Sequence, residues 1–212
     1  MPLTKQDIAW SGDFGCNYTE RNPQTPDDMD ALYKRTYGVT RTEMNIEFLS
    51  SLDRKIRILE VGSNVGTQLM LLWQMGFSNL WGIELQESAV TTARERRKDI
   101  NFLPGTIFDL PFKEGFFDLV FTSGLLIHIH PDKLRDAMRE VYRCSSKYIW
   151  GFEYFSPEPT EVKYRKINDL LWKRDFAKVY FDTFEDLLTT KEMNYPYARG
   201  KNVDSMFLLE KH

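Results

Sequence analysis

Apolar residues follow two different spacings along the chain. Short runs rich in β-branched residues predict buried strands, and apolar positions three or four residues apart predict amphipathic helices. The strands expected on this basis cover residues 56–61, 80–85, 100–103, 117–123, 148–154, 192–197 and 203–209. Helices are expected at 67–75, 87–98 and 132–143, with a long helical stretch at 161–188. Strands and helices that alternate in this way predict an α/β fold with a doubly wound, mostly parallel sheet.

The chain before residue 56 has two parts. The first forty residues are interrupted by glycine and proline, so they are expected to be irregular. The run Thr40-Arg41-Thr42-Glu43 has the form of a capping box and is expected to begin a helix. The apolar residues that this helix is expected to bury are Met44, Phe48, Leu49 and Leu52.

Composition restricts the class of protein. The 212 residues are 42% hydrophobic and 28% charged, which is typical of a soluble globular domain with one core. The net charge of −3 disfavours a nucleic-acid partner, because phosphate contacts require a basic surplus. The chain shows neither a membrane-spanning apolar run nor a secretory signal, and Cys16 and Cys144 lack a metal-ligand pattern. We therefore expect a cytoplasmic protein with free thiols, no membrane association and no metal site.

Residues 58–66, Ile-Leu-Glu-Val-Gly-Ser-Asn-Val-Gly, form the most informative motif. An expected strand carries Glu60 near its end and turns into a helix through a loop that contains Ser63. Gly62 allows a ligand to approach the backbone, and Gly66 allows close contact between helix and strand. Asn64 occupies the middle of the loop and is expected to adopt left-handed backbone angles.

The same motif discriminates between ligands. A nicotinamide site has the spacing G-x-G-x-x-G and places a pyrophosphate at the helix N-terminus. Here the spacing is G-x-x-x-G, and the carboxylate of Glu60 suits the ammonium group of an amino-acid-like ligand. The alternative is a tight turn with a surface glutamate.

A second acid, Glu84, ends the next expected strand and is followed by Leu85. It occurs at the spacing at which a second strand presents an acid to the hydroxyl groups of a ribose. A carboxylate can accept two hydrogen bonds from a vicinal diol. Glu60 and Glu84 together therefore favour a ligand that contains both an amino acid and a nucleoside.

Residues 105–120 contain Gly-Thr-Ile-Phe-Asp-Leu-Pro-Phe followed by Phe-Phe-Asp-Leu-Val. This resembles the segment G-D-A-x-x-L-P-F…F-D-x-V of class I S-adenosylmethionine (SAM)-dependent methyltransferases, a family with a Rossmann-like fold. The resemblance implies SAM as the cofactor and places Thr106 and Ile107 at the adenine. The nearby aromatic residues Phe112, Phe116 and Phe117 are alternatively core packing.

Residues 122–131, Thr-Ser-Gly-Leu-Leu-Ile-His-Ile-His-Pro, follow the fourth expected strand. In the methyltransferase family this segment lies beside the transferring methyl group, which implies a position near the cofactor for Ser123. His128 is the candidate catalytic base, because imidazole accepts a proton near neutral pH. The alternative for His128 or His130 is that it caps the helix beginning near residue 132.

Four stretches extend the resemblance to the methylases associated with pseudaminic acid biosynthesis. They are W-x-x-x-F-G-x-x-Y-x-x-R-N from residue 10, G-x-L-I-H-I-x-P from residue 124, Y-F-x-P-x-P…Y-R…W-K-R-D-F from residue 154, and the final strand at 207–211. Departures occur at Lys166 and in the run 195–197. Residues 1–40 are expected to form a lid over the cofactor, with contacts from Trp10, Tyr18, Arg21 and Asn22. The alternative is that the aromatic residues of this segment anchor the N-terminus to the core.

The same resemblance implies an acceptor side in an insert at about 155–188. The residues expected to bind the acceptor are His130, Tyr154, Tyr164, Arg165, Lys173 and Arg174. The basic residues from 163 to 174 could bind a carboxylate or phosphate, or they could form a solvated helix face.

Taken together, the resemblance implies a single-domain methyltransferase, with a lid at 1–40 and an α/β core at 41–212. The expected acceptor is a small molecule, an anionic sugar or nucleotide sugar methylated on oxygen or nitrogen. Three alternatives remain open: a methyltransferase of another metabolite or a protein side chain, a non-catalytic SAM-binding module, and a nicotinamide-dependent oxidoreductase.

Overall fold

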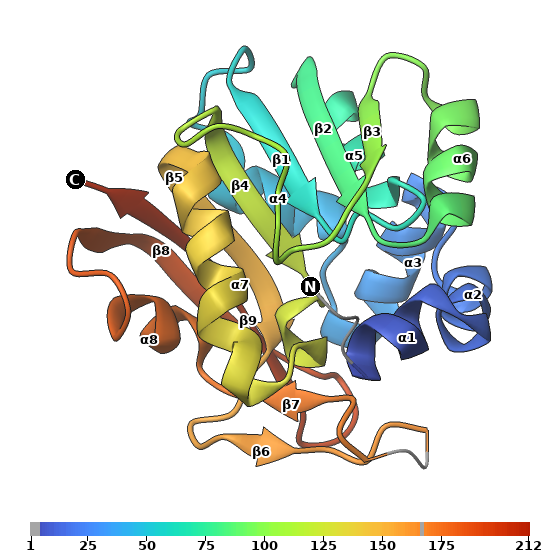
Figure 1. Cartoon of the computed structure of the whole chain (residues 1–212), viewed down its shortest axis with the longest axis vertical. Helices are drawn as coiled ribbons and strands as arrows, with labels where there is room; N and C mark the ends of the chain where they lie inside the picture. Colours follow the sequence, from blue (N-terminus) through green and yellow to red (C-terminus); the bar gives the residue numbers. More distant parts are fainter. Residues whose placement is uncertain (1–4, 166–167) are drawn as a thin grey trace. The chain divides into compact units, whose positions relative to one another are not determined.

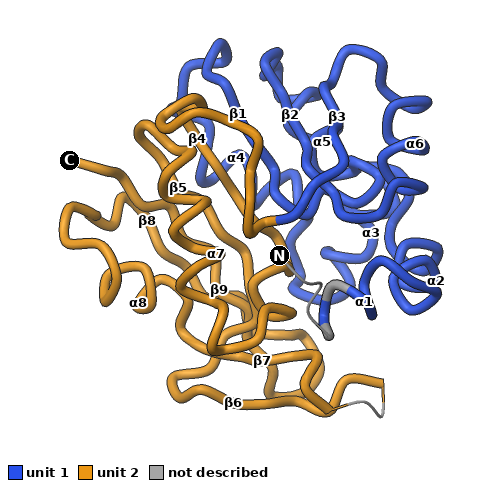
Figure 2. The backbone as a smooth tube through the Cα atoms, viewed as in Figure 1, with its two compact units in different colours: residues 1–106 blue, residues 107–212 orange. Residues whose placement is uncertain are grey.

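The computed structural model describes residues 5–165 and 168–212, and Lys166 lies outside this part of the chain. The contacts between residues divide the chain into two compact units, 1–106 and 107–212, which Figure 2 shows in blue and orange.

The first unit contains helices and a parallel sheet (Figure 1). Its elements are α1 (Lys5–Ser11), α2 (Asp13–Arg21), α3 (Pro26–Tyr37), α4 (Arg41–Leu49), β1 (Arg57–Val61), α5 (Thr67–Gln74), β2 (Asn79–Glu84), α6 (Glu87–Arg96) and β3 (Asn101–Pro104). Strand β2 lies between β1 and β3 and is parallel to both. Helix α5 connects β1 to β2, and α6 connects β2 to β3 and packs against both of these strands. These strand–helix–strand connections confirm the α/β prediction for this unit.

The prediction that the first forty residues are irregular is wrong, because the described residues 5–40 contain three helices. Gly12, Pro23, Pro26 and Gly38 lie at the ends of these helices or between them, and Gly15 lies within α2. Gly12 is the N-cap of α2, and Pro26 is the first residue of α3, a position that tolerates proline. Thr25 caps α3 by accepting a hydrogen bond from the backbone N–H of Asp28 at 3.2 Å. Glycine and proline in this segment therefore mostly separate short helices.

The predicted capping box is confirmed. The side chain of Thr40 accepts from the N–H of Glu43 at 3.0 Å, and the carboxylate of Glu43 accepts from the N–H of Thr40 at 2.7 Å. Helix α4 buries Met44, Phe48 and Leu49 as expected. Leu52 is only half-buried, because the helix ends before it.

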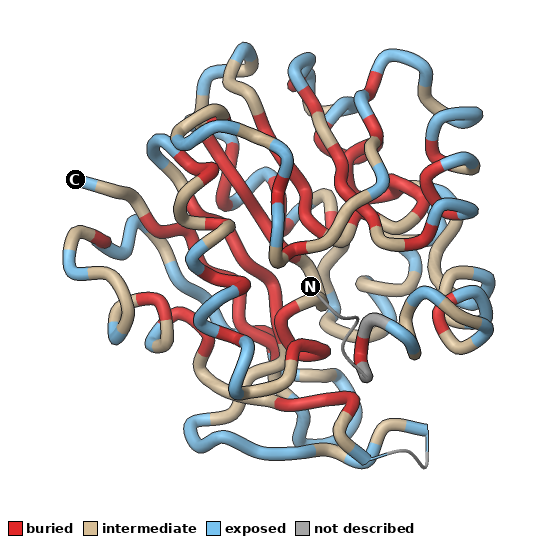
Figure 3. The backbone as a smooth tube through the Cα atoms, viewed as in Figure 1, coloured by how far each residue is buried: buried red, intermediate tan, exposed pale blue. Residues whose placement is uncertain are grey.

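The second unit contains a mixed sheet. Its elements are β4 (Phe117–Ser123), the 3-10 turn η1 (Leu126–His128), α7 (Pro131–Cys144), β5 (Ser145–Tyr154), β6 (Thr160–Glu161), β7 (Trp172–Lys173), α8 (Phe176–Phe181), β8 (Leu187–Pro196) and β9 (Val203–Lys211). Strands β4 and β5 are parallel and are connected by α7, whereas β9 is antiparallel to both β5 and β8. Figure 3 shows that the backbone of β4, β5 and β9 is buried along most of its length.

The prediction of a long helix at 161–188 is wrong. Among the described residues of this segment only α8 is helical, and β6 pairs with β7 in a separate two-stranded sheet. Consecutive apolar residues at 170–172 are all buried, which an extended segment achieves and one face of a helix does not. Arg165 and Asp169 also adopt positive φ angles of 49° and 59°, which a helix cannot contain. Strand β8 correspondingly begins earlier than expected.

The other predicted elements are confirmed to within a few residues at each end. Within the described residues, no helix has the length and apolar character needed to cross a bilayer.

Candidate active site

The loop after β1 has the backbone geometry that its sequence predicts. Gly62, Asn64 and Gly66 have φ angles of 76°, 47° and 78°, so the left-handed conformation expected of Asn64 is confirmed. The N–H groups of Gly62 and Ser63 donate to the carbonyl of Ile83 in β2, at 2.8 and 3.0 Å. The loop is therefore held against the adjacent strand.

Gly66 lies at a close contact within the first unit. A Cβ atom at this position would lie 2.5 Å from the ring of Phe102 in β3. The space that glycine provides is therefore filled by an aromatic side chain, which brings the start of α5 close to the sheet.

Glu84 joins the end of β2 to the loop. One carboxylate oxygen accepts from the N–H of Asn64 at 2.9 Å, and the other accepts from the N–H of Gln86 at 2.9 Å. Burial raises the pKa of Glu84, and these backbone N–H groups oppose the increase. Each oxygen retains lone-pair capacity, so the carboxylate can still accept hydrogen bonds from two hydroxyl groups.

Glu60 has an unmatched carboxylate oxygen in the protein interior. The residue is only 3% exposed, and its Oε2 has no hydrogen-bond partner within the described part of the chain. The hydroxyl of Ser63 is also buried and has no hydrogen-bond partner among the described residues. Burial raises the pKa of Glu60 well above its usual value, and Arg41 opposes this. Burying such a group without a partner costs free energy, which a ligand that donates a hydrogen bond would recover.

A buried polar network on α4 and α5 was not predicted from the sequence. The guanidinium of Arg41 donates to Asn45 Oδ1 at 3.1 Å, and Gln68 Nε2 donates to the same oxygen at 3.1 Å. Among the residues that the structure describes, Asn45 Nδ2 and Gln68 Oε1 have no partner. Gln68, a polar residue within the apolar stretch Thr67–Leu72, is the feature of the sequence that could have indicated this network.

The N-terminal segment contacts the glycine-bounded loop directly. Asn64 Nδ2 donates to the hydroxyl of Thr19 in α2 at 2.9 Å, and the hydroxyl of Thr67 donates to the carbonyl of Pro23 at 3.0 Å. The sequence did not identify Thr19, because its role depends on a contact between distant parts of the chain.

The predicted lid residues occupy different environments. Trp10 is half-buried, and its ring packs edge-on against Phe14 at 5.2 Å and Tyr18 at 5.0 Å between centroids. Asn22 is the C-cap of α2, and Arg21 is exposed. Leu85 and Thr106 are half-buried in the first unit, whereas Ile107 and Ser123 belong to the second. The cofactor contacts expected of these residues remain predictions.

These groups of the first unit fit the two ends of an adenosyl amino acid. Glu60 and Ser63 offer unmatched buried oxygens to an ammonium group, and Glu84 offers a carboxylate to a ribose diol. The backbone of the loop can approach a ligand closely because Gly62 has no side chain.

His128 lies in the turn η1 of the second unit with its ring orientation fixed. Its Nδ1 lies 2.7 Å from the carbonyl oxygen of Leu170. A carbonyl only accepts, so Nδ1 carries the proton and Nε2 is left as an acceptor. Burial lowers the pKa of His128 to about 4. The imidazole is therefore neutral at pH 7 and can receive a proton at Nε2.

Glu153, which was not predicted, holds the turn that carries His128. Its carboxylate accepts from the N–H groups of Leu125 and Leu126 at 3.2 Å and from that of Ile127 at 3.4 Å. The side chain is 1% exposed, and burial raises its pKa to about 7. An acid within the otherwise apolar run of β5 was the sequence sign of this role.

The two histidines have different roles in the structure. His130 is the N-cap of α7 and accepts from the N–H of Asp132 at 3.3 Å, which confirms the capping alternative for this residue. Its ring also contacts Trp172, whereas the ring of His128 contacts Tyr164 at 5.4 Å between centroids.

The expected basic cluster is not a helix face. The Nζ of Lys173 donates to Asn202 at 2.7 Å and lies 5.7 Å from the ring centroid of Tyr154. Arg165 is exposed and lies over Tyr164, and Arg174 lines a pocket elsewhere in the second unit. The solvated-helix alternative is therefore wrong.

The aromatic residues near the start of β4 pack on one another. Phe117 contacts Phe112 and Phe116 edge-on, at 4.7 and 4.9 Å between ring centroids. This agrees with the packing alternative for all three.

Comparison with known proteins identifies a domain within the chain. Residues 58–147 match the family model described as a methyltransferase domain. Over 113 residues the chain is 31% identical to the ribosomal protein L11 methyltransferases of Thermotoga petrophila and Thermotoga maritima. The match covers 52% of this chain and 42% of each relative, so the chain spans less than half the length of these relatives.

Solved structures show the fold of the whole chain. Geranyl diphosphate C-methyltransferase from Streptomyces coelicolor, in complex with Mg²⁺, geranyl diphosphate and S-adenosyl-L-homocysteine, superposes with a TM-score of 0.73 at 11% identity, covering 100% of both chains. Magnesium protoporphyrin IX methyltransferase from Synechocystis PCC 6803 with bound SAM gives 0.70 at 11% identity, also covering 100% of both. The predicted Rossmann-like methyltransferase fold is confirmed.

Proposed function

We propose that this chain, whose residues 58–147 match the model of a methyltransferase domain, is a SAM-dependent methyltransferase that acts on a small acceptor. The observation that carries the proposal is the unmatched oxygen of buried Glu60 beside a loop that Glu84 holds in place. Together these residues offer hydrogen-bond acceptors to both ends of the cofactor.

In the proposed complex, Glu60 binds the ammonium group of SAM and Glu84 binds the ribose hydroxyls. The positive charge of the ammonium would favour the ionised form of Glu60, against the burial that raises its pKa. Thr106 and Ile107 lie at the adenine in this proposal. The lid residues Trp10, Tyr18, Arg21 and Asn22 cover the cofactor, and the bond between Thr19 and Asn64 supports this arrangement.

When bound, SAM would supply a methyl group on a positively charged sulfur. A lone pair of the acceptor would form the new bond to the methyl carbon, and the electrons of the S–CH₃ bond would remain on sulfur. His128 accepts the proton that the acceptor hydroxyl or amine loses, through Nε2. Burial lowers its pKa and so keeps the ring neutral at pH 7, which leaves the lone pair on Nε2; the same shift makes the imidazole a weaker base than in water. Glu153 keeps the turn in place.

The acceptor proposed is an anionic sugar or nucleotide sugar of the nonulosonic acid type. The four stretches that resemble the methylases of pseudaminic acid biosynthesis support it. Its candidate contacts are His130, Tyr154, Tyr164, Arg165, Lys173 and Arg174. A second candidate is methylation of a protein side chain, which the identity to ribosomal protein L11 methyltransferases favours.

Replacement of His128 by alanine tests the catalytic proposal. We expect turnover to fall about 100-fold or more, since a general base contributes that much, with SAM affinity unchanged. The assay follows transfer of a labelled methyl group from SAM to N-acetylneuraminate, nucleotide sugars and a cell extract. Full activity in the variant would eliminate His128 as the base.

The matched control is His212→Ala, which removes an exposed histidine of the second unit and leaves the proposed base and acceptor contacts intact. It is expected to retain turnover. If the wild-type protein binds SAM and forms no S-adenosylhomocysteine with any of these acceptors, the chain is a non-catalytic SAM-binding module instead.

A further inference from the structure

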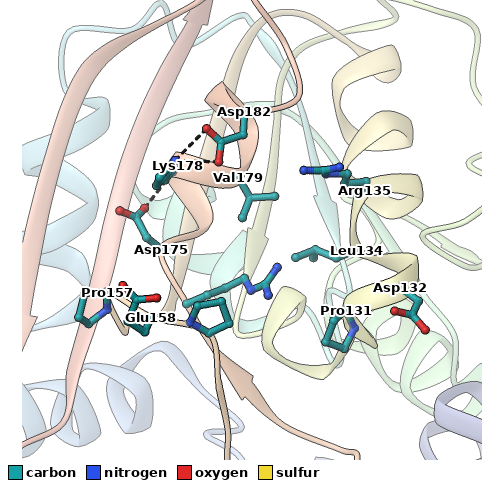
Figure 4. Close-up of a pocket in the computed structure, with 12 residues that line it drawn as sticks. Pro131, Asp132, Leu134, Arg135, Pro157, Glu158, Asp175, Lys178, Val179 and Asp182 are labelled. Atoms are coloured by element: carbon teal, nitrogen blue, oxygen red, sulfur yellow. Dashed lines mark hydrogen bonds and ion pairs between the residues drawn. The ribbon is translucent and has the colours of Figure 1, made fainter.

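The second unit contains a pocket of ≈ 520 Å³ outside the turn that carries His128 (Figure 4). It is lined by the start of α7 at residues 131–135, by residues 157–159, and by residues 174–182, which include α8. All of these segments belong to one compact unit, so the pocket is defined by it alone.

Arg174 places an unmatched cation in this pocket. Its Nε is buried and has no hydrogen-bond partner within the part of the chain that the structure describes. No carboxylate of those residues forms an ion pair with its side chain, and its backbone N–H donates to the carbonyl of Tyr154 at 3.4 Å. A half-buried guanidinium with an unmatched donor is costly, because such a group normally retains water or pairs with an anion.

Arg135 presents a second guanidinium to the same pocket. It lies on α7, and Figure 4 shows its side chain extending toward α8. Burial and the like charge of Arg135 both lower the pKa of Arg174. Arg139, one turn further along α7, differs because it pairs with Asp136 at 2.8 Å. Two arginines that repel each other therefore line one pocket, and neither forms an ion pair with a carboxylate of the described residues.

The acidic residues around the pocket do not supply that counter-charge. Asp182 pairs with Lys178 at 2.8 Å, and Asp175 caps α8 by accepting from the N–H of Lys178 at 2.8 Å. The side chain of Asp132 is 85% exposed and, in Figure 4, points away from the other lining residues. Glu158 is exposed and makes no ion pair within the described chain. The two guanidinium groups therefore remain available to a ligand.

We propose that Arg135 and Arg174 form a binding site for an oxyanion, a carboxylate or phosphate group of a small molecule. The planar guanidinium presents parallel N–H donors that match these groups in a bidentate manner. A bound oxyanion would satisfy the buried Nε of Arg174 and remove the repulsion between the two arginines. Anion binding at this pocket does not require methyl transfer, so it can be measured without the cofactor.

The test uses the full-length protein and the NMR signals of the arginine Nε–H groups. Inorganic phosphate and N-acetylneuraminate, a sugar carboxylate, are titrated separately at constant ionic strength, with chloride as the reference salt. Arg174 is expected to shift saturably with at least one of the two. Saturation by phosphate alone or by the carboxylate alone supports the site and identifies which kind of oxyanion it binds.

Matched variants separate this site from general charge effects. Arg174→Gln and Arg135→Gln are each expected to weaken binding about tenfold or more, as loss of charge-assisted hydrogen bonds does. Arg139→Gln removes a paired arginine of the same helix and is expected to change affinity less than about twofold. Shifts that do not saturate, shifts that chloride reproduces, or equal weakening by Arg139→Gln would each overturn the proposal.

Discussion

Replacement of Glu84 by alanine is expected to weaken SAM binding about 100-fold or more, because two charge-assisted hydrogen bonds to the ribose are lost together. The substitution also removes the acceptor for the backbone N–H of Asn64, which lies 2.9 Å from the carboxylate. The loop that approaches the cofactor is therefore released as well. Calorimetric titration with SAM measures the effect.

Glu87→Ala provides the control for this experiment. Glu87 is an exposed acid in the first turn of α6, close to Glu84 in the sequence, and it lacks a role in the proposed site. Its removal is expected to leave SAM affinity within about twofold, as for most exposed substitutions. Unchanged affinity in the folded Glu84→Ala variant would contradict the ribose assignment.

Replacement of Glu153 by glutamine is expected to change how stability depends on pH. Burial raises the pKa of Glu153 to about 7, so folding favours its protonated form. The stability that protonation provides is complete below the ordinary carboxyl pKa and is lost as the pH rises through 7. The shift corresponds to about 3 kcal/mol, so the wild type should lose about that much relative to the variant between pH 4.5 and pH 8.

The groups that face Glu153 do not contribute to the difference in pH dependence between the wild type and the variant. They are the hydroxyl of Thr122, the backbone N–H groups of residues 125–127, and Tyr180, whose pKa burial raises above its usual value. Other buried acids and His128 are present in both proteins, so their contributions cancel in the difference. Urea unfolding at several pH values gives the two curves.

Glu185→Gln is the control, because Glu185 is exposed. Its stability curve is expected to follow that of the wild type. If the Glu153→Gln curve also runs parallel to the wild type, Glu153 does not titrate in this range and folding does not raise its pKa to about 7.

The sequence predicts the parallel strands and the loop after β1 because local rules specify both. Apolar runs of strand length recur between helices, and Gly62, Asn64 and Gly66 are residues that tolerate the left-handed angles observed. The capping box at Thr40 is equally local, and its bonds form within one turn of the chain.

The remaining features depend on distant contacts. The helical spacing at 161–188 is overridden because burial of three consecutive apolar residues favours an extended chain there. Glu153 acts on N–H groups more than twenty residues earlier, and Asn64 reaches Thr19 across a still longer separation. A periodic pattern contains no information about which distant groups will meet, so Glu153, Thr19 and the Arg41 network were found only in the structure.

The cofactor-binding and catalytic roles proposed above require that SAM binds at the loop 62–66. Calorimetric titration of the wild-type protein with SAM, followed by NADH under the same conditions, tests this directly. We expect saturable binding of SAM at one site per chain, displacement by S-adenosylhomocysteine, and no heat from NADH. An absence of SAM binding together with saturable binding of NADH would contradict the methyltransferase assignment and favour an oxidoreductase.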